Sequence, residues 1–425
     1  MEPADLALAR AVREAGDRLR AALASRLRDF DLAEEALAQA CAAALPAWRR
    51  DGPPKDPAAW LYASARRKAL DHFRRATVRR AHREDERAAQ PTPEDVVLAA
   101  FEPIPDDRLR MIFVCCHPAL AVEARLALTL RTLCGLSTTQ IAAAFLTSEA
   151  AIAQRLTRAK RKIRDARIPF ETPGPDQWPS RLNAVLAALE IAYAQAYERA
   201  ELADRSELAA ETRRLSALLA ELMPAEPEVL GLGALISFAE SRRRARLDGA
   251  GRLVPLDRQD PRLWDMAEIH RAADLLSRAA ALGRTGPLQI LASIHAAHAS
   301  RLRTGVTPWN DILHLYDGLV RLRPGPVSEV HRALALMEAQ GAAPAAAELR
   351  RLGHDGRLDD FLPWRLASAE AEARLGGAEV AEMHLRAALE RVHTPAERGH
   401  IQDWLVRIGP VGRGGRLSKP TARRP

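Results

Sequence analysis

The sequence predicts an all-α protein, with two helical blocks in its first part and a long helical-repeat extension behind them. Aromatic residues make up 4% of the 425 residues, and β-branched residues are sparse beside Ala, Leu and Arg, so little strand is expected. Apolar residues recur at helical spacing, as at Leu32, Ala36 and Ala40. Gly341 and Gly376 lie 35 residues apart, and each separates two expected helices. That spacing is typical of stacked helix pairs; an ordinary helical bundle is the alternative.

Proline and glycine clusters divide the chain into parts. Helices are expected over 5–45, and Pro46 is expected to precede a rigid loop. A further helix begins near Pro57, and a proline-punctuated, charged stretch after it reads as a linker. The expected parts are a first block at 1–85, the linker at 86–104, a second block at 105–170, the extension at 180–408 and a disordered tail at 409–425.

The net charge of +8 is unevenly distributed along the chain. Residues 1–170 carry +7, residues 171–410 carry −4, and residues 411–425 carry +5. Basic ends favour a polyanionic partner, whereas the acidic middle favours a protein partner. A GC-rich genome would also raise Arg and Ala together, so composition alone leaves the origin of the Arg excess open.

Composition excludes several classes of protein. Hydrophobic residues make up 48% of the chain, so it can bury sizeable cores. The first residues lack the cationic and apolar runs of a signal peptide, and no uncharged apolar stretch is long enough to span a membrane. Four cysteines do not make a disulfide framework. We therefore expect a cytoplasmic protein without a membrane anchor.

The sharpest motif lies at 137–163. Ser137 followed three residues later by Gln140 matches a capping box that begins a short helix. Leu146 and Thr147 then make a turn, with Thr147 placed to cap the next helix. In that helix a single apolar stripe is expected to be buried: Ile152, Leu156, Ala159 and Ile163. This pattern is typical of a helix-turn-helix, whose second helix enters the DNA major groove; a helical hairpin with a solvated basic face is the alternative.

The outer side of this second helix carries residue types suited to DNA. Near its start, Glu149, Ala150 and Gln154 would meet base edges, because Gln can pair with adenine and Glu can accept from cytosine. Basic residues follow and would mainly contact phosphates: Arg158, Lys160, Arg161, Lys162 and Arg164.

A second basic cluster lies in the first block. Arg66-Arg67-Lys68 and Arg74-Arg75 are interleaved with Trp60, His72 and Phe73. Aromatic rings beside cations suit melted DNA, because bases stack on rings and phosphates need positive charge. Trp60 and Phe73 could equally be core residues, with only the arginine face in contact with DNA.

The sequence contains no catalytic or metal-binding constellation. Cys115-Cys116-His117 resembles a set of metal ligands, but adjacent cysteines on a helix point apart and no second pair lies at zinc spacing. Buried thiols are the better interpretation, and no phosphate-binding glycine motif occurs. We expect neither an enzyme nor a bound cofactor or metal.

These blocks resemble bacterial sigma-70-type RNA polymerase sigma factors, in particular the small extracytoplasmic-function group. Residues 31–37 resemble sigma region 2.2, residues 56–71 resemble regions 2.3 and 2.4, and residues 154–164 resemble region 4.2. The resemblance implies a region 2 helical bundle, a region 4 helix-turn-helix and a role in transcription initiation. The implied partners are core RNA polymerase, contacted through its β′ clamp and β flap, and promoter DNA.

The resemblance also implies a role for individual residues. Ala38-Gln39 departs from the usual Gln-Glu of region 2.2, and Leu146 stands where many helix-turn-helix proteins have glycine. We expect the fragment 105–168 to recognise DNA by itself. The implied contacts are Asp31, Glu34, Glu35 and Gln39 for core polymerase; Trp60, Arg66, Arg67, Lys68, His72, Arg74 and Arg75 for the −10 element; and Ser148, Glu149, Ala150, Gln154, Arg155, Arg158, Lys160 and Arg161 for the −35 element.

The likeness continues beyond the second block. Residues 112–120, 168–170, 221–224, 226–232 and 243–260 resemble a subgroup of these factors with a long, tetratricopeptide-like extension, which implies regulation or the binding of a protein regulator. The rival hypothesis is a helix-turn-helix regulator or scaffold that does not act through core polymerase, since region 2.2 departs from the usual pattern.

Overall fold

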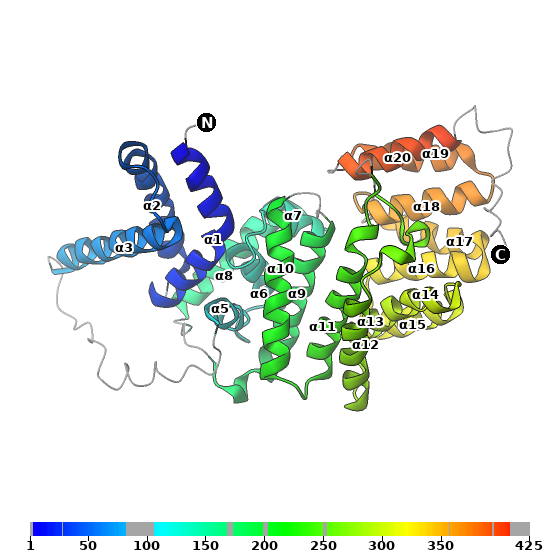
Figure 1. The fold of residues 1–425 in the computed structure, drawn as a ribbon, viewed down its shortest axis with the longest axis horizontal. Helices are drawn as coiled ribbons and strands as arrows, with labels where there is room; N and C mark the ends of the chain where they lie inside the picture. The colour runs from blue at the N-terminus through cyan, green and yellow to red at the C-terminus, as the bar shows by residue number, and fades with distance from the viewer. Residues whose placement is uncertain are drawn as a thin grey trace. The chain divides into compact units, whose positions relative to one another are not determined.

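The computed structural model describes residues 3–27, 29–81, 106–166, 168, 173–198, 203–249, 253–356, 358–392 and 395–408. The described residues are helical throughout, apart from turns and one isolated β-bridge between Leu247 and Leu253 (Figure 1). This confirms the expected all-α class. The expected linker at 86–104 and tail at 409–425 lie outside the described residues. The chain divides into two compact units, 1–215 and 216–425.

Three helices open the first unit: α1 (Pro3–Leu27), α2 (Phe30–Asp51) and α3 (Pro57–Ala81). All three pack against one another, and the core between them includes Leu23, Ala40 and Leu61, none of which is exposed. Asp29 caps α2 by accepting a hydrogen bond from the backbone N–H of Leu32 at 3.0 Å. The sequence led us to expect that the helix would end before Pro46. Instead, Pro46 lies inside α2, and the helix continues to Asp51.

Among the described residues, six further helices belong to the first unit: α5 (Asp107–Cys115), α6 (Val122–Thr132), α7 (Thr138–Ala144), α8 (Glu149–Asp165), α9 (Pro179–Glu198) and α10 (Ala203–Leu222), whose last residues belong to the second unit. Helix α9 contacts α5, α6 and α7, and α5 also contacts α1. The compact unit therefore extends beyond the boundary near residue 170 that the prolines indicated.

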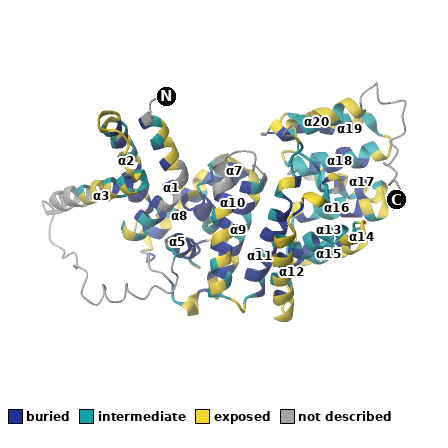
Figure 2. Cartoon of the chain, viewed as in Figure 1, coloured by how far each residue is buried: buried dark blue, intermediate teal, exposed yellow. Residues whose placement is uncertain are grey.

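The second unit is a series of stacked helices: α11 (Pro227–Ser241), α12 (Met266–Ala281), α13 (Pro287–Ala299), α14 (Arg301–Thr304), α15 (Trp309–Leu322), α16 (Pro326–Gln340), α17 (Ala342–Leu352), α18 (Leu362–Arg374), α19 (Ala378–Leu389) and α20 (Pro395–Ile408). From α15 onward each helix contacts the next, and α16 also contacts α18, as in a solenoid of helix pairs. Buried residues lie on the sides where helices pack (Figure 2).

The two glycines noted in the sequence lie at turns between paired helices. Gly341 has φ +101° between α16 and α17, and Gly376 has φ +86° between α18 and α19. Positive φ is accessible to glycine without strain, so these two positions allow sharp reversals of the chain. The helix pairs α16–α17 and α18–α19 begin at Pro326 and Leu362, which are 36 residues apart.

Candidate nucleic-acid interface

Helices α7 and α8 form the expected helix-turn-helix. Both bonds of the capping box are present: Ser137 N–H donates to Gln140 Oε1 at 2.8 Å, and Gln140 N–H donates to Ser137 Oγ at 3.2 Å. The cap of α8 is Ser148 rather than Thr147, since Ser148 Oγ accepts from the backbone N–H of Ala151 at 3.2 Å. Thr147 N–H instead donates to the carbonyl of Ala142 at 3.0 Å and closes the turn.

The turn places Leu146 in the left-handed region, with φ +49°. Leucine carries a Cβ that crowds the backbone there, at a cost of about 1–2 kcal/mol. The backbone of this turn is therefore strained, because the glycine that many such motifs have at this position is replaced by leucine.

We expect Leu146→Gly to be about 1 kcal/mol more stable than Leu146→Ala, because both lose the same packing and only glycine relieves the strain. Chemical denaturation of the full chain would measure the difference. As a control, Ala143→Gly in helical α7 should be about 1 kcal/mol less stable than the parent chain. Equal stabilities of the two Leu146 variants would contradict the strain.

Helix α8 divides into a buried and an exposed side as predicted. Its apolar stripe is buried, with Ile152 fully so. The residues expected to face DNA are exposed: Ser148, Glu149, Ala150, Gln154, Arg158 and Arg161, with Arg155 at intermediate exposure. These side chains thus present groups able to hydrogen-bond to base edges at the start of the helix and cations after them.

Lys160 departs from this pattern, because it contacts α2. Its Nζ lies 2.8 Å from Asp31 Oδ1 and 3.1 Å from Glu34 Oε2, and its side chain is only 19% exposed. Arg164 adds a contact to Asp31 at 3.5 Å. Burial lowers the pKa of Lys160, but the hydrogen bond to Asp31 and the charge of Glu34 outweigh it and the net pKa is raised. We refer to Asp31, Glu34, Lys160 and Arg164 as the α2–α8 ion cluster.

The remaining expected polymerase contacts lie on another part of α2. Glu35 and Gln39 are exposed one helical turn apart, and Gln39 Nε2 donates to Glu35 Oε1 at 3.0 Å. The four residues that the sequence grouped together therefore split into two that bind α8 and two that face solvent.

The expected −10 contacts lie on α3. Arg66, Arg67 and Lys68 are exposed. Trp60 is partly buried and packs edge-on against Trp48, with ring centroids 5.5 Å apart, so it belongs partly to the core. His72, Arg74 and Arg75 lie on the same helix, but their side chains are outside the described residues.

Sequence reasoning missed the polar contacts that bind α5 to α9 and α10. Arg181 is 5% exposed and donates to the backbone carbonyl of Phe113 at 2.9 Å. Arg214 contacts Asp106 at 2.7 Å, and Arg108 contacts Glu211 at 3.2 Å. Only the capping role of Asp106 leaves a local sequence signal, because the other partners are far apart in the chain.

The adjacent cysteines are buried thiols, as interpreted from the sequence. Cys115 Sγ lies 4.0 Å from Thr132 Oγ1, and Cys116 Sγ lies 3.8 Å from Thr129 Oγ1. Burial raises the pKa of Cys116 to about 12, so the thiolate form is disfavoured. The part of the chain that the structure describes holds no group of three or more side chains able to hold a metal ion.

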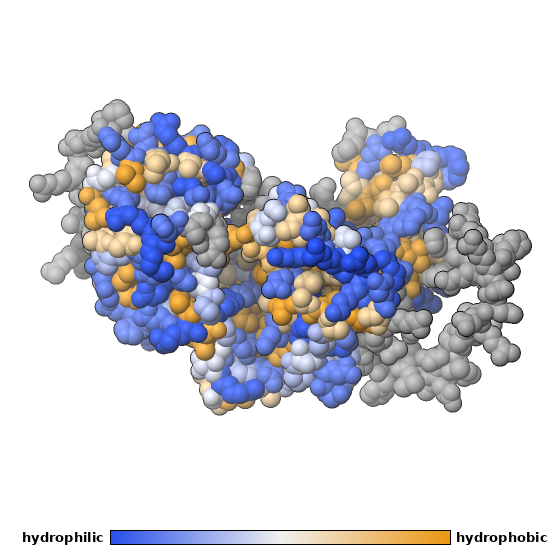
Figure 3. All heavy atoms as spheres, turned by 180° about the vertical axis from the view of Figure 1, so that it is seen from behind, coloured by the Kyte–Doolittle hydropathy of each residue, from blue (hydrophilic) through white to orange (hydrophobic). Residues whose placement is uncertain are grey.

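The described helices include none that is long and apolar enough to cross a membrane. Hydrophilic residues predominate on the face of the molecule shown in Figure 3, with hydrophobic residues scattered between them.

Comparison with known proteins agrees with this arrangement. Residues 11–79 match the family model of sigma-70 region 2, residues 110–163 match sigma-70 region 4, and residues 181–280 match a family of unknown function, DUF6596. The chain is 39% identical over 386 residues to an uncharacterized protein of Rhizobium meliloti (strain 1021), covering 90% of this chain and 91% of that protein. No solved structure matches the chain. The chain thus contains a sigma-70 region 2 domain, a sigma-70 region 4 domain and a DUF6596 domain, and the two sigma-70 domains support a sigma-70-type sigma factor that acts in promoter recognition.

Proposed function

We propose that the chain directs core RNA polymerase to promoters as a cytoplasmic sigma factor of the extracytoplasmic-function group. In this proposal α8 reads the −35 element, α3 contacts the −10 element, and residues 1–85 dock on the β′ clamp while 105–170 reach the β flap. The observation that carries the proposal is the exposed face of α8, where Glu149 and Gln154 precede Arg158 and Arg161. Base-reading groups followed by phosphate-binding cations are what a recognition helix needs.

Two DNA contacts on one chain make specific binding possible even where each contact is weak. When the −35 helix is bound, the −10 surface is held close to its own site, which raises its effective concentration. The exposed cations Arg66, Arg67 and Lys68 supply the phosphate attraction at the second contact.

The extension would then bind a protein regulator through its tetratricopeptide-like helix pairs. Two observations support this role: the extension carries a net negative charge, which disfavours binding to DNA, and its helices stack in pairs. A regulator or scaffold that does not use polymerase is the second candidate, favoured by the two acids of α2 that are engaged by α8.

Run-off transcription with purified core polymerase on genomic fragments tests the function directly. The expected result is discrete transcripts that depend on the chain. Specific DNA binding with no transcript from any fragment would favour the second candidate.

We expect Glu35→Ala combined with Gln39→Ala to weaken retention on immobilised core polymerase by about tenfold, because these exposed groups would face the polymerase clamp. They are preferable to Glu34, which also holds Lys160. Glu123→Ala, an exposed acid on α6, is the matched control and should leave retention unchanged. Unchanged retention of the double variant would remove α2 from the polymerase interface.

A further inference from the structure

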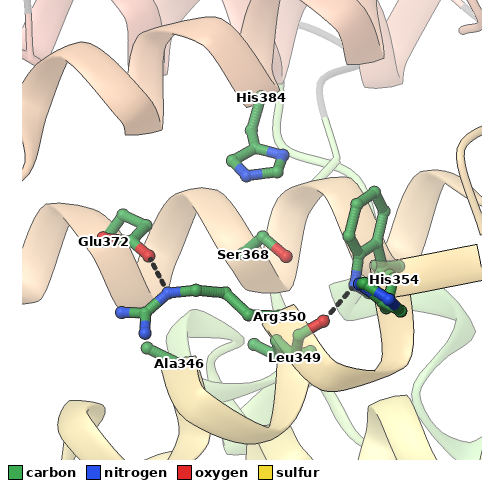
Figure 4. Close-up of a pocket in the computed structure, with 9 residues that line it drawn as sticks. Ala346, Leu349, Arg350, His354, Ser368, Glu372 and His384 are labelled. Atoms are coloured by element: carbon green, nitrogen blue, oxygen red, sulfur yellow. Dashed lines mark hydrogen bonds and ion pairs between the residues drawn. The ribbon is translucent and has the colours of Figure 1, made fainter. Parts of the chain in front are cut away.

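A small cavity lies inside the extension, between α17, α18 and α19 (Figure 4). Its volume is about 180 Å³, and its apolar lining includes Ala346, Leu349 and the indole of Trp364. Trp364 is held in place because its Nε1 donates to the carbonyl of Leu349 at 2.9 Å. Gly353 leaves the space that the indole occupies, since a Cβ there would overlap the ring.

Two polar side chains reach this cavity from neighbouring helices, as Figure 4 shows. Ser368 is 6% exposed and His384 is 9% exposed. Among the described residues, neither the Ser368 hydroxyl nor His384 Nδ1 has a hydrogen-bond partner. Ser293 in α13 behaves differently, because its hydroxyl donates to the carbonyl of Gln289 at 2.9 Å. Leaving a buried polar group unpaired is costly, so a bound polar group would be stabilised here.

The polar groups around the cavity favour an acceptor-rich ligand. Arg350 and His354 lie at its exposed side, and Glu372, the only carboxylate that lines it among the described side chains, already accepts from Arg350 at 3.1 Å. Burial lowers the pKa of His384, so its imidazole is neutral near pH 7 and can carry its proton on Nδ1. Ser368 and His384 can then both donate.

We propose that this cavity binds a short-chain carboxylate, whose oxygens accept hydrogen bonds from Ser368 and His384 while its alkyl part packs on Trp364 and Leu349. The cavity is too small for a nucleotide or a peptide segment and suits a ligand of a few heavy atoms. This binding does not depend on whether the chain acts with polymerase. It would make the extension responsive to a small molecule.

Isothermal titration of the full chain with acetate, propionate and butyrate tests the cavity, and propionamide serves as the uncharged isostere. We expect propionate to bind with a Kd on the order of 1 mM and propionamide to bind about tenfold more weakly. Ser368→Ala should weaken propionate by about tenfold, and Ser293→Ala should leave it unchanged. No heat from any acid, or equal affinities in the parent chain, Ser368→Ala and His384→Gln, would overturn the proposal.

Discussion

Truncation of the chain after residue 170 is expected to unfold the helix-turn-helix block rather than release it as an independent domain. The reason is α9, which packs on α5, α6 and α7 and buries its own apolar side against them. Val185 is fully buried, Leu189 is 1% exposed, and Trp178 lies against Phe113 with ring centroids 5.8 Å apart. Each such side chain contributes about 1.5–3 kcal/mol when buried, and whole domains are stable by only about 5–15 kcal/mol.

Thermal melts followed by circular dichroism would compare chains ending at residues 170 and 222 with the full chain. The chain ending at 222 retains α9 and α10 and should keep a cooperative transition, whereas the shorter chain should lose the transition of the second block. DNA binding by a folded 105–168 fragment would contradict this expectation. That outcome would restore the modular view which the sequence alone favoured.

This difference shows what local sequence patterns can and cannot predict. The buried stripe of α8 follows directly from a 3.6-residue period, and all four of its members are buried. The prolines at 169–175 resemble a domain boundary, but the chain continues into a helix that packs on the preceding block. Which helices pack together depends on matching surfaces across the fold, and a single sequence does not carry that information locally.

Some features of the candidate DNA-binding site could likewise be predicted from local sequence, and others could not. The exposure of Gln154, Arg158 and Arg161 could be predicted, because it is the complement of the buried stripe. The engagement of Lys160 could not, since its partner Asp31 is 129 residues away. Thr147 and Ser148 are both good capping residues, and in the structure Ser148 caps α8, whereas Thr147 closes the turn that contains the left-handed Leu146.

Replacement of both Arg158 and Arg161 by alanine is expected to weaken binding of the full chain with core polymerase to its promoter by about 100-fold. Both side chains are exposed on the side of α8 that is proposed to face DNA, so their loss should remove phosphate contacts without opening the core. Each phosphate contact contributes close to one unit to the dependence of log affinity on log salt, so the slope should fall by about two. Fluorescence anisotropy over a salt series would measure both quantities.

Gln154→Ala should have a different signature, because Gln154 stands near the start of α8, the part of the helix that is proposed to read base edges. It should cost about 1–3 kcal/mol at one base position and leave the salt slope unchanged. Arg321→Ala, an exposed arginine of the extension, is the control for a general loss of charge and should change neither quantity. Two results together would mean that α8 does not enter the groove: Gln154→Ala leaves the base preference unchanged, and the double arginine variant leaves the salt slope unchanged. The distinction between slope and preference thus separates a recognition helix from a merely basic surface, which affinity alone cannot do.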